Sequence, residues 1–233
     1  MIFGYKFSGM SRIKGELHNM KNFLRRAWAE VHLDRLSGNL AALRSLINED
    51  KTQIACVVKA NAYGHDDGNV AAFLETQGVS FFAVSNIKEA ENIRRSGVKG
   101  EILILGHTPA EYAKELAEFD IIQAAVSLGY ARELSEAAVN AGVRVKIHMA
   151  VDTGMGRIGV CASDSGSINT AANDICSVAK LDGIILDGAF THYAAADSLD
   201  EDDIAYTDAQ TERFFAVCDR VKENGVSLRH THC

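Results

Sequence analysis

A lysine stands where a short apolar segment meets a polar loop. The segment IACVVKA (54–60) is rich in β-branched residues and predicts a buried strand, with Lys59 near its carboxyl end. Reactive groups of parallel α/β folds gather at the carboxyl ends of strands. A neutral lysine amine can attack an aldehyde and form a Schiff base, so Lys59 is a candidate for covalent catalysis. Position alone favours a simpler interpretation, a strand-end lysine that reaches water.

A glycine loop with an arginine is the second candidate site. The string VDTGMGRIG (151–159) directly follows the apolar segment VRVKIHMA (143–150). Gly154 and Gly156 allow a tight turn and a close approach of the backbone to a ligand. Arg157 carries a permanently charged planar group that suits a carboxylate or a phenolate oxygen. A surface turn that happens to carry an arginine would show the same short pattern.

Three histidines lie at predicted strand ends. His192 closes the segment GIILDGAFTH (183–192), and His230 and His232 lie in the string HTHC (230–233). Alternate residues of a strand point the same way, so His230 and His232 could share a metal ion. No third ligand with suitable spacing accompanies them, and no metal site is predicted.

The elements that must position these residues alternate along the chain. Apolar β-rich runs predict strands, and segments with helical spacing follow them; Pro109 suits a first helical turn, Ser127 an N-cap and Gly142 a helix stop. The predicted strands cover 27–33, 54–60, 81–85, 101–106, 121–126, 143–151, 183–192 and 226–233. The predicted helices cover 36–48, 69–78, 87–97, 109–119, 127–142, 167–180 and 204–225. This alternation predicts a parallel sheet with helices outside it.

An open doubly wound sheet and a (β/α)8 barrel both satisfy the alternation. A barrel typically needs about 250 residues, and the repeats here are too few to close one. We therefore expect the 233 residues to be the front portion of a longer chain.

Composition narrows the class of protein. A net charge of −7 argues mildly against nucleic acid as a partner. No apolar run approaches the roughly 18 residues of a membrane span. The five cysteines are scattered without a C-x-x-C pair, which favours a reducing, cytoplasmic compartment. Residues 1–26 are basic and are interpreted as a leader or linker; they lack the features of a secretory signal.

The two main motifs together resemble a known family. KANAYGH (59–65) is similar to the first signature of the alanine racemases, and DTGMGRIG (152–159) to the second, in the family's order. GAFTHYAAAD (188–197) resembles a third family segment. The resemblance covers residues 27–233 and implies the (β/α)8 TIM-type barrel, incomplete in this chain, without the family's C-terminal β domain.

The resemblance also implies a cofactor and its contacts. Pyridoxal 5′-phosphate would form a Schiff base with Lys59, and Tyr63 would contact its phosphate. Arg157 would direct the substrate carboxylate and the ring oxygen, and His192 would lie beside the ring. Two positions depart from the family pattern. Asp66 stands where glycine is common, and Ala150 replaces a lysine that is carbamylated in many members, so the usual bridge to Arg157 must be absent or replaced.

The activity implied by the resemblance is racemisation of a small amino acid. Removing and returning an α-proton needs an electron sink, which the cofactor provides, and bases on opposite faces. Lys59 would serve one face, and a tyrosine of the partner subunit of a homodimer the other. We expect conversion of L-alanine to D-alanine for cell-wall peptide, with serine as an open alternative, and little or no turnover by this fragment alone.

Two other functions stay open at this point. One is a non-catalytic pyridoxal-phosphate-binding barrel protein, although such proteins lack the full DTGMGR string. The other is an assembly module of a larger membrane-linked racemase, such as the serine/alanine racemase of a resistance protein. A decarboxylase with the same barrel fits less well because its lysine motif differs.

Overall fold

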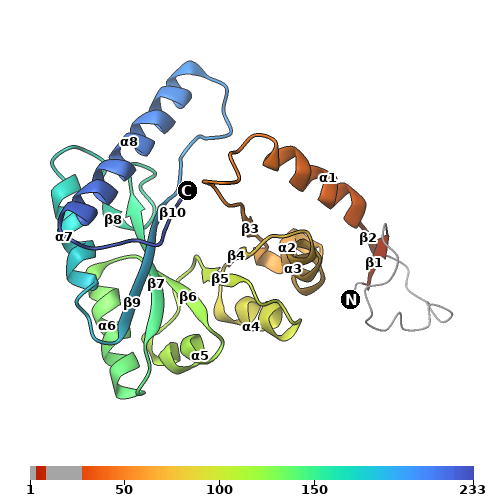
Figure 1. The fold of residues 1–233 in the computed structure, drawn as a ribbon, viewed down its shortest axis with the longest axis horizontal. Coiled ribbons are helices and arrows are strands. Elements are labelled where there is room, and N and C mark those ends of the chain that lie inside the picture. The colour runs from red at the N-terminus through yellow and green to blue at the C-terminus, as the bar shows by residue number, and fades with distance from the viewer. Residues whose placement is uncertain (1–3, 9–27) are drawn as a thin grey trace. The chain divides into compact units, whose positions relative to one another are not determined.

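The computed structural model describes residues 4–8 and 28–233, which form two compact units, Met1–Ile102 and Leu103–Cys233 (Figure 1). Strand β5 (Glu101–Ile104) runs across the boundary between the two units.

Two pairs of parallel strands belong to the first unit. β1 (Gly4–Ser8) pairs with β2 (Trp28–His32), and β3 (Ala55–Val57) pairs with β4 (Phe81–Val84). All four residues of β4 are buried, as expected for a parallel strand covered on both faces. β1 lies within the segment interpreted as a leader or linker, and the sequence had not indicated a strand there. The rest of that segment, apart from residues 4–8, lies outside the described residues.

The helices described in the first unit are α1 (Leu33–Arg44), α2 (Lys59–Gly64), α3 (Asp67–Thr76) and α4 (Ile87–Arg95). Of these, α3 and α4 begin and end within two residues of their predicted bounds, whereas α1 begins three residues and ends four residues earlier than predicted. The Asn86 side chain caps α4 by accepting a hydrogen bond from the Glu89 N–H, at 3.1 Å. α2 has no predicted counterpart, because the sequence predicted no helix between β3 and α3.

The second unit contains a parallel sheet in the order β10-β9-β7-β6. These strands are β6 (Ile121–Ala125), β7 (Val145–Asp152), β9 (Ile184–Thr191) and β10 (His230–His232), and the short strand β8 (Val160–Cys161) also pairs with β7. Met149 lies opposite Ala189, and Gly188 lies opposite His230. The carboxyl ends of β7 and β9, where the sequence placed candidate residues, are therefore neighbours.

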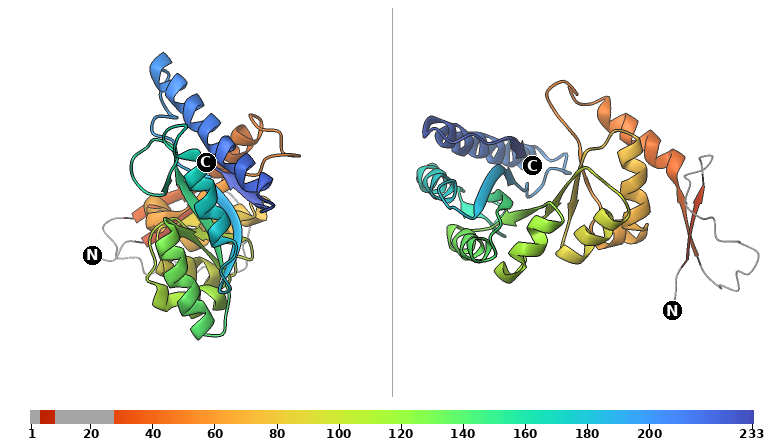
Figure 2. Two further views of the ribbon diagram at one scale, coloured as in Figure 1. Left: turned by 90° about the vertical axis from the view of Figure 1, so that its left-hand side faces the viewer. Right: turned by 60° about the horizontal axis from the view of Figure 1, so that its bottom comes forward.

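Helices follow the strands of the second unit as predicted. They are α5 (Ala113–Glu118), preceded by the 3-10 turn η2 (Ala110–Tyr112), then α6 (Leu128–Asn140), α7 (Ile168–Val178) and α8 (Glu201–Glu223). α7 packs against both α6 and α8, and these three helices lie outside the strands (Figures 1 and 2). The predicted cap is confirmed, since the Ser127 hydroxyl accepts a hydrogen bond from the Tyr130 N–H at 3.1 Å.

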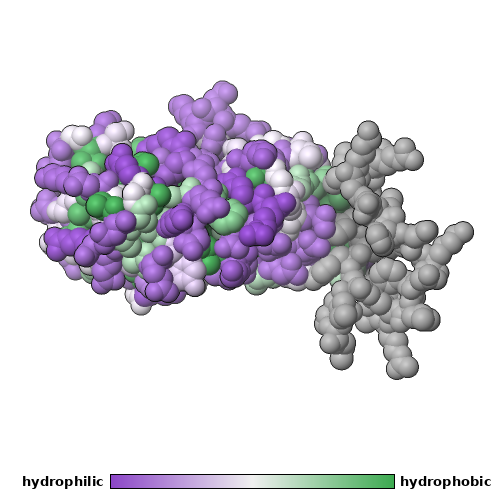
Figure 3. Space-filling model, turned by 90° about the horizontal axis from the view of Figure 1, so that it is seen from below, coloured by the Kyte–Doolittle hydropathy of each residue, from purple (hydrophilic) through white to green (hydrophobic). Residues whose placement is uncertain are grey.

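The predicted fold class is confirmed by this arrangement. Parallel strands alternate with helices in each unit, as in an incomplete (β/α) barrel. On the face drawn in Figure 3, hydrophilic residues separate small hydrophobic patches, a pattern that is ordinary for a protein surface. Within residues 4–8 and 28–233, no helix combines the length and the apolar character needed to cross a bilayer.

Candidate active site

Lys59 stands at the start of a turn with an unusual backbone. β3 ends at Val57, and Lys59 opens α2. Four consecutive residues of α2, none of them glycine, adopt left-handed φ angles. These are Ala60 (φ 53), Asn61 (φ 56), Ala62 (φ 50) and Tyr63 (φ 54). A left-handed helix costs L-residues roughly 1–2 kcal/mol each, so surrounding contacts must stabilise this turn.

Hydrogen bonds from the following helices hold the turn. The Ala60 N–H donates to Glu89 Oε1 at 2.9 Å, while Glu89 Oε2 accepts from the N–H and the hydroxyl of Ser85, both at 2.8 Å. Asn61 Oδ1 accepts from the Asp67 N–H at 3.1 Å. The Glu89 carboxylate therefore joins the turn after Lys59 to the end of β4 and the first turn of α4.

The turn leaves its two candidate side chains accessible. Lys59 is half-buried, and Tyr63 is 61% exposed. Asp66, which replaces a common glycine of the family pattern, has a φ of 73, in the region that glycine favours. Its carboxylate accepts a hydrogen bond from the Asn69 N–H at 3.2 Å and so caps α3. This cap offsets part of the backbone strain and explains why an aspartate is tolerated there.

The glycine loop of the second unit joins β7 to β8. Asp152 Oδ1 accepts hydrogen bonds from the N–H groups of Gly154 and Gly156, both at 3.0 Å, which folds the loop tightly. A Cβ at Gly159, whose φ is 124, would lie 2.8 Å from the Asp152 nitrogen and 2.9 Å from the Ala150 oxygen. Only glycine therefore fits where the loop closes.

Arg157 projects from this loop, where it is exposed. Within the part of the chain that the structure describes, its guanidinium makes no hydrogen bond or ion pair. Ala150, at the position of the family lysine, is only 2% exposed and offers no polar group. The guanidinium is thus available to an anionic ligand, and its placement depends on the backbone of the loop.

His192 directly follows β9, and its side chain is exposed. The Thr191 and Thr153 hydroxyls lie 2.7 Å apart and join the end of β9 to the glycine loop. Gln210 of α8 adds a second link, because its Nε2 donates to Thr153 Oγ1 at 3.1 Å and to the His192 carbonyl at 3.3 Å. The structure therefore ties the segments that carry Arg157 and His192 to each other.

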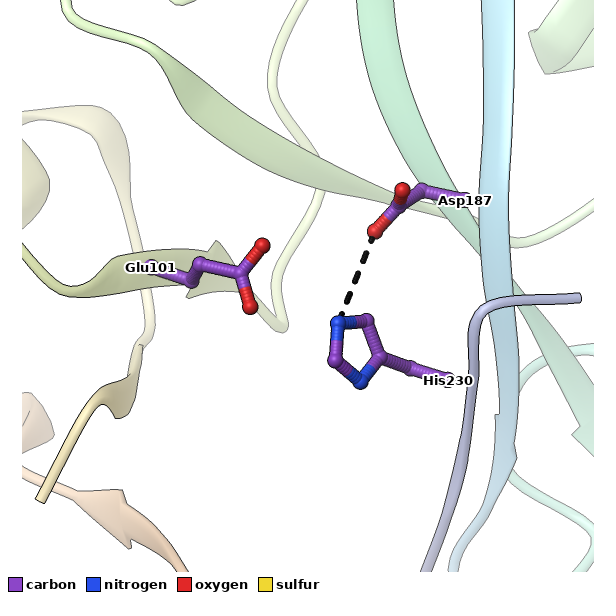
Figure 4. Close-up of side chains that lie close together, drawn as sticks. All are labelled: Glu101, Asp187 and His230. Atoms are coloured by element: carbon purple, nitrogen blue, oxygen red, sulfur yellow. Dashed lines mark ion pairs between the residues drawn. The ribbon is translucent and has the colours of Figure 1, made fainter.

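Side chains of β7, β9 and β10 form a polar cluster that is buried at His148 and Asp187. His148 is fully buried; its Nδ1 lies 2.9 Å from His232 Nε2, and its Nε2 lies 3.3 Å from Asp187 Oδ2. Arg229 holds the Asp187 carboxylate with two hydrogen bonds of 2.9 Å, and His230 Nε2 faces the same carboxylate at 4.0 Å (Figure 4). Both histidines of the HTHC string thus belong to a network that includes an aspartate.

The network controls the charge of its members. Burial alone would raise the pKa of the Asp187 carboxyl, but hydrogen bonds from Arg229 and His148 outweigh it and hold that pKa below its usual value. Burial, together with the charges of His148 and His230, lowers the pKa of His232 to about 3. His232 also stacks on Phe190, with ring centroids 5.1 Å apart, and is neutral at physiological pH.

Sequence reasoning did not single out His148, Asp187 or Gln210. The sequence did contain a signal for each of them. Each is a polar residue at a position of a strand or helix where the pattern predicts a buried apolar side chain. Gln210 is in helical register with the buried residues Phe214, Val217 and Val221. A polar residue in such a stripe indicates a satisfied hydrogen-bonding role.

Comparison with known proteins identifies the family. The family model described as "Alanine racemase, N-terminal domain" matches residues 31–233. The chain belongs to the alanine racemase family. An alanine racemase of Clostridium perfringens is 37% identical over 209 residues, which cover 90% of this chain and 52% of that protein. Alanine racemase 2 of Caldanaerobacter subterraneus is 39% identical over 203 residues, which cover 87% of this chain and 50% of that protein.

Solved structures of racemases also resemble the structure of this chain. The alanine racemase of Clostridium difficile 630 in complex with cycloserine matches 91% of this chain and 56% of its own, with a TM-score of 0.81 and 34% identity. A histidine racemase from Leuconostoc mesenteroides matches 86% of this chain and 50% of its own, with a TM-score of 0.70 and 26% identity. The chain thus spans about half the length of the curated relatives that it matches.

The candidate residues of this alanine racemase-family chain fall into two groups. Lys59 and Tyr63 share one left-handed turn of the first unit. Arg157 and His192 lie on two loops of the second unit that Thr153, Thr191 and Gln210 connect.

Proposed function

We propose that this chain supplies the pyridoxal-phosphate-binding barrel portion of an amino-acid racemase, with Lys59 as the residue that binds the cofactor aldehyde. The observation that carries the proposal is the position of Lys59, at the carboxyl end of β3 and at the start of a strained turn held by Glu89. Strained backbone held by specific contacts is common where a reactive side chain must be aimed. Membership of the alanine racemase family supports the same assignment.

The residues present fit the cofactor in chemical type. The cofactor aldehyde reacts with an amine, which Lys59 offers from a half-buried position. The cofactor phosphate binds hydrogen-bond donors, such as the exposed hydroxyl of Tyr63. A ring oxygen and a substrate carboxylate both suit the exposed guanidinium of Arg157. The exposed imidazole of His192 completes the set as a group to lie beside the ring.

The bound cofactor would act as the electron sink that makes the α-proton of an amino acid removable. Lys59, once its amine is free, would take or return that proton on one face. Arg157 would bind the substrate carboxylate and fix the orientation of the α-carbon. Tyr63 would anchor the phosphate, and His192 would hold the position of the ring.

The whole protein would be a cytoplasmic homodimer in which a tyrosine of the partner subunit serves the opposite face. Its reaction would be the interconversion of L- and D-alanine, which provides a building block of cell-wall peptide, with serine as the alternative substrate. We propose that the 233 residues supply Lys59 as one of the two bases, and we expect little or no turnover from them alone.

Covalent attachment is the direct test. The purified chain is mixed with pyridoxal 5′-phosphate, its visible absorbance is recorded, and the bond is fixed by borohydride before peptide mass analysis. We expect a visible band and a cofactor-sized mass increase on the peptide that contains Lys59, both lost in Lys59→Ala. Lys51→Ala, at an exposed lysine outside the site, is the matched control and should behave as the wild type. Labelling that persists in Lys59→Ala would refute the assignment.

A second measurement separates the racemase from a non-catalytic cofactor-binding protein. The chain is extended by the C-terminal half of the Clostridium perfringens relative, and chiral chromatography follows L-alanine and L-serine. Conversion that requires Lys59 supports the racemase. Cofactor binding without conversion of either amino acid in this longer chain would favour the non-catalytic alternative.

A further inference from the structure

Three side chains of α8 form a stripe that faces the glycine loop. Tyr206, Gln210 and Arg213 are spaced i, i+4 and i+7, so they lie on one face of the helix. We call these three residues the α8 stripe. Each of them donates a hydrogen bond to the segment Thr153–Gly154, which ends three residues before Arg157.

Gln210 is the centre of the stripe and is fully buried. Its Nε2 donates to Thr153 Oγ1 at 3.1 Å and to the His192 carbonyl at 3.3 Å, and its Oε1 accepts from the Ala194 N–H at 2.9 Å. Both ends of the amide are therefore used, which is what a buried polar group requires. One side chain thus holds the loop that carries Arg157 and the segment that carries His192.

The outer residues of the stripe hold the backbone of the glycine loop. The Tyr206 hydroxyl donates to the Gly154 carbonyl at 2.7 Å, and Arg213 NH1 donates to the Thr153 carbonyl at 2.9 Å. The Arg213 guanidinium also lies over the Tyr206 ring, 5.9 Å from its centroid. A Cβ at Gly154 would collide with the Tyr206 hydroxyl, so the loop backbone lies directly against the stripe.

We infer that the α8 stripe positions Arg157 and His192, and that Gln210 sets the spacing between the two loops that carry them. Arg157 has no side-chain partner within the described residues, and the lysine of the family pattern is replaced by the buried Ala150. Its direction is then set by the loop backbone, which the stripe holds. This inference rests on the proposed function for the role of Arg157 and His192, but the mechanical link can be measured without the cofactor.

The first experiment measures amide hydrogen exchange of the protein without cofactor. Gln210→Met keeps the side-chain volume but removes both donors and the acceptor. We expect exchange to rise about tenfold in 153–157 and in 192–194, the ratio that corresponds to the loss of roughly one net hydrogen bond. Tyr206→Phe, a change at a partly exposed position, should raise exchange in 153–157 alone. Glu212→Gln, at an exposed position of the same helix, is the matched control and should change neither segment.

The second experiment uses the chain extended by the C-terminal half of the Clostridium perfringens relative and loaded with the cofactor. Because Tyr206→Phe loosens only the Arg157 loop, it should raise KM for the amino acid about threefold and leave kcat within about twofold. The melting temperature should stay at the wild-type value, which separates positioning from a general loss of stability. Gln210→Met should affect both KM and kcat, because both loops lose their link.

The outcomes distinguish the inference from the proposed function. Unchanged exchange in both segments of Gln210→Met, or in 153–157 of Tyr206→Phe, would overturn the inference whatever the enzyme does. If Gln210→Met fails to fold, Tyr206→Phe alone decides. The protein could show the expected exchange pattern and yet neither bind the cofactor nor racemise an amino acid. That result would support the link between the two loops and would refute the proposed function.

Discussion

Replacing Ala60 by glycine should stabilise the protein. Ala60 is exposed and has a φ of 53 in the left-handed turn after Lys59. Glycine at this position would relieve roughly 1–2 kcal/mol of backbone strain, while its greater freedom in the unfolded chain would cost about 0.5–1 kcal/mol. The difference predicts that Ala60→Gly raises the free energy of unfolding by up to about 1.5 kcal/mol, with a central value of roughly 0.75 kcal/mol.

The matched control is Ala42→Gly, at an exposed alanine in the right-handed helix α1. There glycine relieves no strain, and the free energy of unfolding should fall by about 1 kcal/mol. Urea unfolding followed by circular dichroism gives both values under the same conditions. The two substitutions are therefore expected to have opposite signs. If Ala60→Gly lowered stability as much as Ala42→Gly, the turn would not be strained and the reasoning about Lys59 would fail.

Three other changes test the site and the polar cluster. Glu89→Gln removes the charge that accepts from the Ala60 N–H, so we expect a loss of about 1–3 kcal/mol of stability in urea unfolding and weaker cofactor uptake in an absorbance titration. Gly159→Ala forces a Cβ against the Ala150 oxygen at a φ of 124 and should lower the melting temperature, with a cost of about 1–3 kcal/mol. His232 has a pKa of about 3 when folded against 6.5 as its ordinary value, so the unfolded chain binds the proton first. Stability should therefore fall as the pH drops from about 6.5 towards 3, by up to about 1.4 kcal/mol per pH unit, and urea unfolding across this range should show a shallower fall for His232→Gln.

Local sequence signals were sufficient for most of the regular elements, although β1, α2 and the short strand β8 were not predicted. The Ser127 cap and the apolar runs that became β4 and β6 follow short-range rules, and the structure agrees with them. The apolar run also located Lys59 near the end of a strand, although the predicted strand ran to residue 60, whereas β3 ends at Val57 and Lys59 opens α2. The family resemblance, which rests on contiguous strings, is confirmed by the match over residues 31–233.

Features that depend on distant contacts were not predictable in the same way. The left-handed turn after Lys59 contains no glycine until Gly64, and its stability depends on Glu89, which lies 29 residues further along the chain. Gln210 finds its partners 57 and 18 residues away. The pairing of β1 with β2 likewise joins segments separated by a long stretch. Secondary-structure propensity depends on residues that are close in sequence, so it could not predict these long-range contacts.

The α8 stripe also sets an order for assembly during synthesis. Arg213 and its acceptor, the Thr153 carbonyl, are 60 residues apart in the chain. At translation rates of about 5–20 residues per second, the Arg157 loop leaves the ribosome roughly 3–12 seconds before its last hydrogen-bond donor is made. Until β9 is made, the side-chain hydrogen bonds to the loop are those within it, from Gly154 and Gly156 to Asp152, and the links to Thr191, Tyr206, Gln210 and Arg213 then follow in chain order. The glycine loop therefore reaches its final form late, and the growing chain carries an unfinished Arg157 loop through the synthesis of β9 and most of α8.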